Sequence, residues 1–436
     1  MTTQTGYKVS ELGEIPLDWE IGTIGKDCVL KARIGWQSLR IDEYLESGEY
    51  GLITGTDFNN GLVDWKTCSF VSEWRYKQDT NIQLKVNDVL ITKDGTIGKL
   101  GYINELPFLA TLNSGIYVVR PKNSNLIEPM FLFYLFSSEY FNNFISVISA
   151  GSTITHLYQK DFVNFQFPLP SKSEQTAIAT VLSDTDALIS SLQTLIAKKK
   201  AIKLSAMQNL LSGKILLPEF AQRLDGSPKT TRQTELGLLP EDWKVVELGD
   251  VLSLVLNKKV DAPFFTFIGM QDVSEEAKII NQTVLPITQL KSGLTYFEEN
   301  DVLVAKITPC FENGKGGYAH NLKTQIGFGS TEFHILRANQ QADAEFIYYW
   351  TISPKFRQQL AIDMVGSAGH KRVPFQALLK FKIPLPSKPE QTAIAQLLSD
   401  MDAEIEALEC RLKKTQSLKQ GMMQALLTGK IRLLLE

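Results

Sequence analysis

Apolar residues recur at alternating spacings of four and three in two stretches of the chain, 171–215 and 387–436. A period of 3.5 residues kept over several heptads is typical of a coiled-coil helix. Each stretch is long enough for a helix of about 40 residues, or roughly 60 Å. The predicted seam consists of Ile178, Leu182, Ile189, Leu192, Ile196, Ile394, Leu398, Met401, Ile405, Leu408 and Leu412.

Both ends of these helices carry local signals. Each stretch follows Pro-Leu-Pro, which disfavours helix, and opens with a serine followed three residues later by Glu174 or Glu390. This spacing predicts a capping box, in which the serine hydroxyl accepts from the glutamate N–H and the glutamate carboxylate reaches back. Gly213 and Gly429 stand where a glycine would end each helix.

A single coiled-coil helix cannot bury its seam, so each of the two helices needs a partner. The simplest solution is that they pair with each other. Because each helix leads away from a globular region, antiparallel pairing would place the two globular regions at opposite ends of a rigid spacer. The alternative is that each helix packs only on its own domain.

The regions before the helices show a different pattern. Strand-like runs such as 87–93 and 300–307 alternate with glycine-rich turns and with helical stretches at 128–145 and 344–362. We therefore expect an α+β protein in which two mixed α/β modules are joined by two long helices that form an antiparallel coiled coil. The expected division is 1–170 for the first module with its opening segment, 171–215 for the first helix, 216–233 for a linker, 234–386 for the second module and 387–436 for the second helix.

The chain repeats itself at both boundaries of these modules. SELGEIPLDW at 10–19 returns as TELGLLPEDW at 234–243, and PLPSKSEQTAIA at 168–179 returns as PLPSKPEQTAIA at 384–395. The segments between these motifs differ strongly. Such a pattern indicates a pseudo-two-fold internal repeat, in which the constant parts share one job and the two middles do related but distinct jobs. A plain duplicated structural domain is the alternative.

Composition narrows the protein class. Hydrophobic residues make up 44% and charged residues 21%, as in ordinary globular proteins. No apolar run approaches the ~20 residues of a membrane helix, and residues 1–16 do not resemble a secretion signal, so we expect a cytoplasmic protein. The scattered cysteines argue against a zinc site or a disulfide framework, and we expect no metal and no cofactor. The net charge of −3 still leaves room for a local basic surface that binds phosphates.

Residues suited to DNA contacts lie in loops at matching places in the two modules. Lysine and arginine neutralise phosphates, whereas Ser, Thr, Asn and Arg can also read base edges. A Gly-Lys loop is more often a solvated turn, but its recurrence in both halves favours a functional role. The DNA-binding candidates are Thr92, Lys93, Thr96, Lys99, Ser152, Thr155, His156, Lys160, Lys306, Thr308, Asn313, Lys315, Ser367, His370, Lys371 and Arg372.

The whole chain resembles the specificity subunit of type I restriction-modification systems. The resemblance rests on the repeated helix motif PLP…EQ…LSD…GKI, on the repeated ELG…P.DW openings, and on NDVLVAKITPCFENGKGGY at 300–318. It implies that each divergent middle is a target recognition domain that reads one half of a bipartite site in double-stranded DNA. It also implies that the helices set the half-site spacing and dock two copies of the modification (methyltransferase) subunit. Restriction (motor-nuclease) subunits would join through the complex.

The sequence carries no catalytic signature that would make the chain an enzyme by itself. It has no P-loop, no Asn-Pro-Pro-aromatic run of an amino-methyltransferase, and no HExxH. Two rival hypotheses stay open. One is an enzyme that uses the second Gly-Lys loop with Cys310, although Cys310 has no counterpart in the first half. The other is a scaffold that binds two copies of a partner through its coiled coil without DNA.

Overall fold

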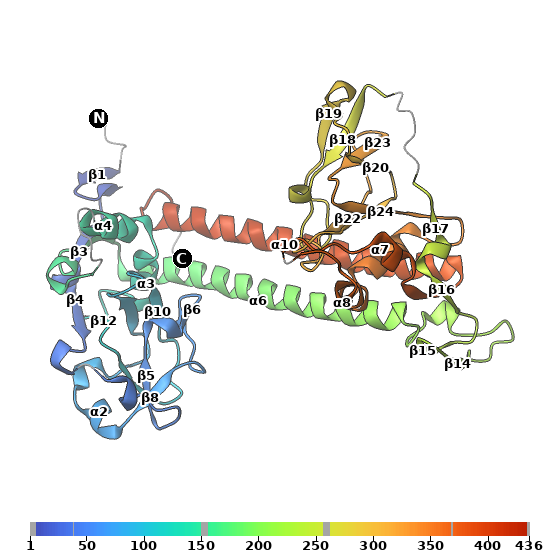
Figure 1. Ribbon diagram of the computed structural model, residues 1–436. Helices are drawn as coiled ribbons and strands as arrows, with labels where there is room; N and C mark the ends of the chain where they lie inside the picture. Colours follow the sequence, from blue (N-terminus) through green and yellow to red (C-terminus); the bar gives the residue numbers. More distant parts are fainter. Residues whose placement is uncertain (1–5, 38, 150–155, 256–261, 368, 434–436) are drawn as a thin grey trace. The chain divides into compact units, whose positions relative to one another are not determined.

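Two long helices dominate the secondary structure (Figure 1). The structure, a computed structural model, describes residues 6–37, 39–149, 156–255, 262–367 and 369–433. Helix α6 (Lys172–Leu211) has 40 residues and α10 (Lys388–Leu426) has 39, which confirms the two predicted helices. Gly213 and Gly429 follow them with φ of +68° and +70°, the left-handed conformation in which glycine ends a helix.

Contacts divide the chain into two compact units, 1–193 together with 410–436, and 194–409. Each unit therefore holds the start of one long helix and the end of the other. The division expected from the sequence treated the helices as segments of their own, whereas the compact units divide both helices between them.

Within each unit the two helix segments run antiparallel. In the first unit, Asp186 of α6 lies 2.6 Å from Lys419 of α10. In the second unit, Lys199 of α6 pairs with Glu404 of α10 at 2.7 Å, and Lys203 pairs with Asp402 at 2.6 Å. As the residue numbers of the paired side chains rise along α6, those of their partners on α10 therefore fall. Antiparallel pairing of the helices is confirmed, and the alternative in which each helix packs only on its own domain is wrong.

The predicted seam positions are shielded from solvent along both helices. The fully buried members at the helix starts also belong to the domain cores: Leu182 packs with Leu426 in the first unit, and Leu398 packs with Leu210 in the second. The other buried members are Ile178, Leu192, Ile196, Ile394 and Ile405, and the half-buried ones are Ile189, Met401, Leu408 and Leu412.

The first module contains two sheets, of strand order β4-β12-β9-β10-β7-β6 and β11-β5-β8. Side chains from both sheets, among them Leu90, Val118 and Ile53, share one core. The opposite face of the larger sheet, with Val89 and Val119, packs on α3 (Pro129–Phe136) and α4 (Glu139–Ser149). The strands are β4 (Cys28–Ala32), β5 (Tyr50–Ile53), β6 (Phe58–Asn59), β7 (Leu62–Val63), β8 (Ser69–Val71), β9 (Val89–Thr92), β10 (Leu100–Tyr102), β11 (Leu109–Leu112) and β12 (Ile116–Pro121).

The second module repeats the centre of this topology although its sequence differs, and among the described strands it has no counterpart of β6 and β7 but one additional strand, β20. Its sheets have the order β17-β24-β21-β22 and β19-β18-β23-β20, and β18 pairs with β23 in parallel as β5 does with β11. Helices α7 (Ala344–Ile352) and α8 (Pro354–Ile362) take the places of α3 and α4. The strands are β17 (Leu252–Ser253), β18 (Phe264–Ile268), β19 (Thr283–Pro286), β20 (Thr295–Glu298), β21 (Val302–Ala305), β22 (Gly316–Tyr318), β23 (Ile326–Gly329) and β24 (Phe333–Ala338).

Short elements complete both modules. The opening hairpins are β1 (Tyr7–Ser10) with β2 (Gly13–Pro16), and β14 (Thr231–Thr234) with β15 (Gly237–Pro240). The strands that lead into the long helices are β3 (Glu20–Thr23) with β13 (Gln166–Leu169), and β16 (Lys244–Glu247) with β25 (Lys382–Leu385). Four short helices are α1 (Ile24–Asp27), α2 (Glu73–Lys77), α5 (Gln159–Phe162) and α9 (Phe375–Leu379). Across the described ranges, no helix combines the length and apolarity that crossing a membrane requires.

The repeated opening motif has a structural reason. Trp19 and Trp243 are fully buried, and their indole Nε1–H groups donate to Glu174 at 3.1 Å and to Glu390 at 3.2 Å. The Ser171 hydroxyl does accept from the Glu174 N–H at 3.3 Å. The predicted capping box is nevertheless wrong in its second half, because both carboxylates bind a tryptophan of the opening segment instead of reaching back.

Candidate nucleic-acid interface

The predicted loop residues of the first module leave from one edge of its larger sheet. At this edge β9 ends at Thr92, which is paired with Ile116 at the start of β12. The next residue of β12, Tyr117, is paired with Ala32 at the end of β4. The loops after β4 and β9 and the turn before β12 are therefore neighbours. Loops that are positioned by a rigid sheet are a common place for binding groups.

Thr92 organises the loop between β9 and β10. The Thr92 side chain is 4% exposed, and its hydroxyl accepts from the Lys99 N–H at 2.9 Å and donates to the Thr96 carbonyl. Lys99 Nζ donates to the Gly55 carbonyl at 2.9 Å, in the turn that follows β5. Thr92 is thus a support of the loop, whereas Thr96 and Lys99 are exposed on it.

Asp94 links two of the predicted basic residues. His156 Nδ1 is hydrogen-bonded to the Asp94 carboxylate. Lys93 Nζ lies 3.9 Å from the same carboxylate and 5.5 Å from the centre of the Tyr117 ring. Lys160, at the start of α5, is exposed. The structure therefore brings Lys93 and His156 together, while Ser152 and Thr155 lie outside the described residues.

Matching backbone contacts hold the loops of both modules: in the first, the Lys93 N–H donates to the Gly115 carbonyl at 2.9 Å and the Lys93 carbonyl accepts from the Leu157 N–H at 3.0 Å. Lys306 follows β21 as Lys93 follows β9. Its N–H donates to the Glu332 carbonyl at 2.9 Å and its carbonyl accepts from the Val373 N–H at 2.9 Å. Lys315 Nζ donates to a backbone carbonyl in the turn after β18 at 3.0 Å, which matches the contact of Lys99 in the first module. The two modules thus present corresponding loops.

Backbone hydrogen bonds join this loop to the segment before α9. The Thr308 N–H donates to the Lys371 carbonyl at 2.9 Å, and the Lys371 N–H donates to the Thr308 hydroxyl at 3.1 Å. Arg372 forms two hydrogen bonds with the Glu332 carboxylate, at 3.0 and 2.8 Å. This pairing holds the pKa of Glu332 below its usual range. Both residues of the pair are therefore charged in the neutral pH range.

The other DNA-binding candidates of the second module differ in whether their side chains are already hydrogen-bonded. Asn313 donates to the Glu275 carboxylate at 3.0 Å, so its amide is already engaged. The side chains of Ser367, His370 and Lys371 are exposed. Lys371 is thus a cationic side chain of the second loop edge that is free to meet a phosphate.

Two buried polar side chains near the first loop edge were missed by the sequence-based prediction. Arg33, which follows β4, is 2% exposed and donates to the Leu112 carbonyl at 2.8 Å and to the Thr111 hydroxyl at 3.2 Å. Its Nη1 and the buried Gln37 Oε1 have no hydrogen-bond partner. Burial lowers the pKa of Arg33. A single arginine after a strand carries no local sequence signal, so the hydrogen bonds by which Arg33 supports this edge could not be predicted.

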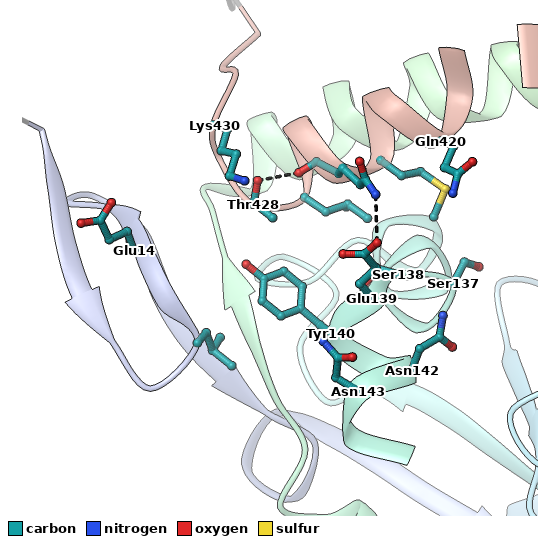
Figure 2. Close-up of a pocket in the computed structure, with 14 residues that line it drawn as sticks. Glu14, Ser137, Ser138, Glu139, Tyr140, Asn142, Asn143, Gln420, Thr428 and Lys430 are labelled. Carbon is teal, nitrogen blue, oxygen red and sulfur yellow. Dashed lines mark hydrogen bonds between the residues drawn. The ribbon is translucent and has the colours of Figure 1, made fainter. Parts of the chain in front are cut away.

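A groove of about 690 Å³ on the first unit contains none of the predicted residues. Figure 2 shows Glu139 and Tyr140 at the start of α4 facing the last turns of α10, where Gln424 donates to Glu139 at 2.9 Å. The other charged residues that line the groove are Glu14 and Lys430. The groove therefore lacks the excess of cations that phosphate binding needs. Among the described residues, no group of three or more His, Cys, Asp or Glu side chains is arranged to hold a metal ion.

Comparisons with known proteins agree along the whole chain. The family model described as "Type I restriction modification DNA specificity domain" matches residues 16–201 and again residues 240–416. The putative type I restriction enzyme MjaX specificity subunit of Methanocaldococcus jannaschii is 26% identical over 439 residues, which cover 98% of this chain and 97% of that protein. The MjaVIII specificity subunit of the same organism is 27% identical over 435 residues, or 96% and 94% of the two chains.

A solved structure shares the fold. The crystal structure of the S subunit of a type I restriction-modification system from M. genitalium matches with a TM-score of 0.55 and 15% identity, over 98% of both chains. The family match covers most of this chain in two copies, each over one module and the long helix that follows it. The chain therefore belongs to the family of type I restriction-modification DNA specificity subunits.

Proposed function

We propose that this chain reads the DNA sequence for a type I restriction-modification complex. The observation that carries the proposal is the double match to the specificity domain, one copy over each module and its helix. Each recognition module reads one half of a bipartite site in double-stranded DNA. The long helices set the spacing of the half-sites and dock two modification (methyltransferase) subunits, and restriction subunits join through that complex. The chain selects the site, and its partners carry out the chemistry, in the cytoplasm where the DNA is.

The loop edges supply the groups that this role needs. Lysines such as Lys99 and Lys371 neutralise phosphates, and a binder that displaces counterions in this way is sensitive to salt. Exposed polar side chains such as Thr96 and Ser367 stand on the same loops and can meet base edges. The net charge of −3 does not oppose this, because the basic groups are local to the loops.

A module exchange tests the proposal. In a complex with its methyltransferase partner, the chain should retard DNA that carries its bipartite site more strongly than DNA that lacks it. Replacing residues 27–165 by the recognition module of a relative should change one half of the methylated sequence and leave the other half as it was. Sequencing of methylated DNA from cells that express the complex measures both halves at once.

Two outcomes would decide against DNA reading. Unchanged specificity after the exchange would mean that the modules do not read sequence. Assembly with the partner but no preference for any DNA site would favour the alternative, a scaffold that binds two copies of a partner through its coiled coil.

A further inference from the structure

A hydrogen-bonded triad connects three elements of the first unit. The Tyr134 hydroxyl on α3 donates to the Asp186 carboxylate on α6 at 2.9 Å. Lys419 on α10 lies 2.6 Å from the same carboxylate, and its Nζ stands 5.5 Å from the centre of the Tyr134 ring. One carboxylate thus ties the recognition module, its own long helix and the long helix of the other repeat together.

The second unit contains the same triad. The Tyr349 hydroxyl on α7 donates to Asp402 on α10 at 3.0 Å. Lys203 on α6 lies 2.6 Å from Asp402 and 5.5 Å from the centre of the Tyr349 ring. Asp402 follows Asp186 by 216 positions and Lys419 follows Lys203 by the same number, the offset of the two Pro-Leu-Pro motifs. Tyr349 follows Tyr134 by 215 positions, one fewer, so the internal repeat relates the two triads with the helices exchanged.

The ion pairs of both triads are less exposed than the pair of Lys199 with Glu404, which also joins the two helices. Lys203 and Asp402 are 16% and 22% exposed and Lys419 and Asp186 are 23% and 39% exposed, whereas Lys199 and Glu404 are 34% and 49% exposed. Burial, and after it the Asp186 carboxylate, raises the pKa of Tyr134, and burial likewise raises that of Tyr349. Both phenols therefore keep the proton that they donate. A carboxylate that accepts from a buried phenol and also pairs with a half-buried lysine prefers one geometry.

Apolar seams alone do not define one register. A row of leucine and isoleucine can slide by a heptad and bury itself again, and natural coiled coils prevent this with a polar group at a defined position. One helical turn of sliding moves a side chain by about 5.4 Å, which is enough to separate Lys419 from Asp186. We propose that the two Tyr–Asp–Lys triads are positioning residues that fix the register of α6 against α10 and the attachment of each module to them, and that they thereby determine which gap between half-sites is accepted.

This inference rests on the proposed function, and the geometry of DNA makes the accepted gap length a sensitive measure of it. One base pair added to the gap moves the second half-site by about 3.4 Å along the duplex and about 35° around it. The purified complex with its methyltransferase subunits is offered DNA in which the two half-sites are separated by gaps of every length. Sequencing then measures the ratio of methylation at the preferred gap to methylation at gaps one base pair longer or shorter.

Charge reversal should loosen the choice of gap. In Asp186→Lys and Asp402→Lys, two lysines face each other across the helices, and the ratio should fall by about tenfold, a typical effect of coupled contacts. The half-site sequences should stay the same. Adding Lys419→Asp to the first variant and Lys203→Asp to the second restores opposite charges and should recover most of the ratio. Lys199→Glu reverses an exposed pair between the same helices and should leave the ratio unchanged.

The outcomes separate the two proposals. If the wild-type complex methylates without any site preference, the proposed function itself fails. If the wild type is selective and the reversed variants, assayed well below their melting temperature, keep its gap ratio, the triads do not position anything. Should a reversed variant not fold, Tyr134→Phe with Tyr349→Phe removes only the hydroxyls. This double variant should lower the ratio, and an unchanged ratio in it would refute the inference.

Discussion

Two equivalent glutamates at the starts of the long helices have different surroundings. Glu174 accepts from Trp19 and also from Arg432, whose guanidinium bridges to Asp18 as well. In the second repeat the position of Arg432 is taken by a leucine, Leu216. Glu390 accordingly has Trp243 as its hydrogen-bond donor, and its buried Oε1 has no partner. Burial raises the pKa of Glu390 to about 7.

Glu390 should make the stability of the chain depend on pH. An acid whose pKa is raised from 4.5 to about 7 binds its proton more tightly in the folded chain, so stability falls as pH rises through that window. Glu390→Gln should therefore stabilise the chain by about 1–3 kcal/mol at pH 8 and have little effect at pH 5. Thermal unfolding at both pH values measures this.

Glu174→Gln is the matched control. It removes a carboxylate that is paired with Arg432, so it should lower the melting temperature at pH 8 instead of raising it. Equal responses of the two variants at pH 8 would contradict the difference between the repeats.

Lys371 should contribute to DNA affinity through a phosphate. Its side chain is exposed on the second loop edge, so Lys371→Ala should weaken binding to all DNA sequences similarly and reduce the slope of log affinity against log salt by about 1. Lys244→Ala, on the exposed side of β16, is the control that should leave the slope as it is. Titrations at several salt concentrations measure the slopes. Loss of preference for one base, with the salt slope unchanged, would instead assign Lys371 to base reading.

Local sequence signals revealed some of these residues and not others. The loop lysines were found because they recur at matching places, and the helices because their apolar period is long. Asp186 and Asp402 carry no local signal of their role, although each is the centre of a triad. Arg33 likewise does not belong to the predicted residues. Partners of these groups lie far away in sequence, and local spacing carries no information about them.

At the scale of elements, the constant end of each repeat terminates a long helix and packs against an opening segment. Gly429 ends α10 with φ of +70°, and a Cβ placed on it would come within 2.5 Å of Pro16 and 3.2 Å of Trp19. Gly213 stands in the same relation to Pro240 and Trp243. The repeated GKI and P.DW motifs were thus recognisable from sequence, but their contact with each other was not. The shared order of the central strands in the two modules was equally hidden, because their sequences diverge.

Gly429→Ala should destabilise the first unit. The left-handed backbone alone costs an alanine about 1 kcal/mol, and the close approach to Pro16 adds to it. Gly421→Ala, inside α10 with nothing within 4 Å of its added Cβ, should instead stabilise by about 1 kcal/mol. Chemical denaturation of both variants measures the difference. A neutral effect of Gly429→Ala would mean that the helix end can rearrange.

At the scale of the whole molecule, reading and spacing are assigned to different parts of the chain. The modules differ in sequence but share a topology, and the helices are long, regular and paired antiparallel in each unit. This separation predicts that the helices can be changed without altering what the modules read.

Shortening both helices by one heptad tests that separation. Seven residues are removed from α6 within 188–200 and seven from the equivalent part of α10, which shortens each helix by about 10 Å, or roughly three base pairs of DNA. The preferred gap should change, and both half-site sequences should remain. Sequencing of methylated sites reads out both properties. New half-site sequences would show that the helices take part in reading.

The Arg432 contacts make the short segment after α10 important for the opening segment of the chain. Arg432 forms ion pairs with Asp18 and Glu174 and lies over the Trp19 ring, while the Tyr7 hydroxyl donates to the Gly429 carbonyl. A truncation before position 432 would leave α10 complete and yet take the counter-charge away from Glu174, a carboxylate that is 2% exposed.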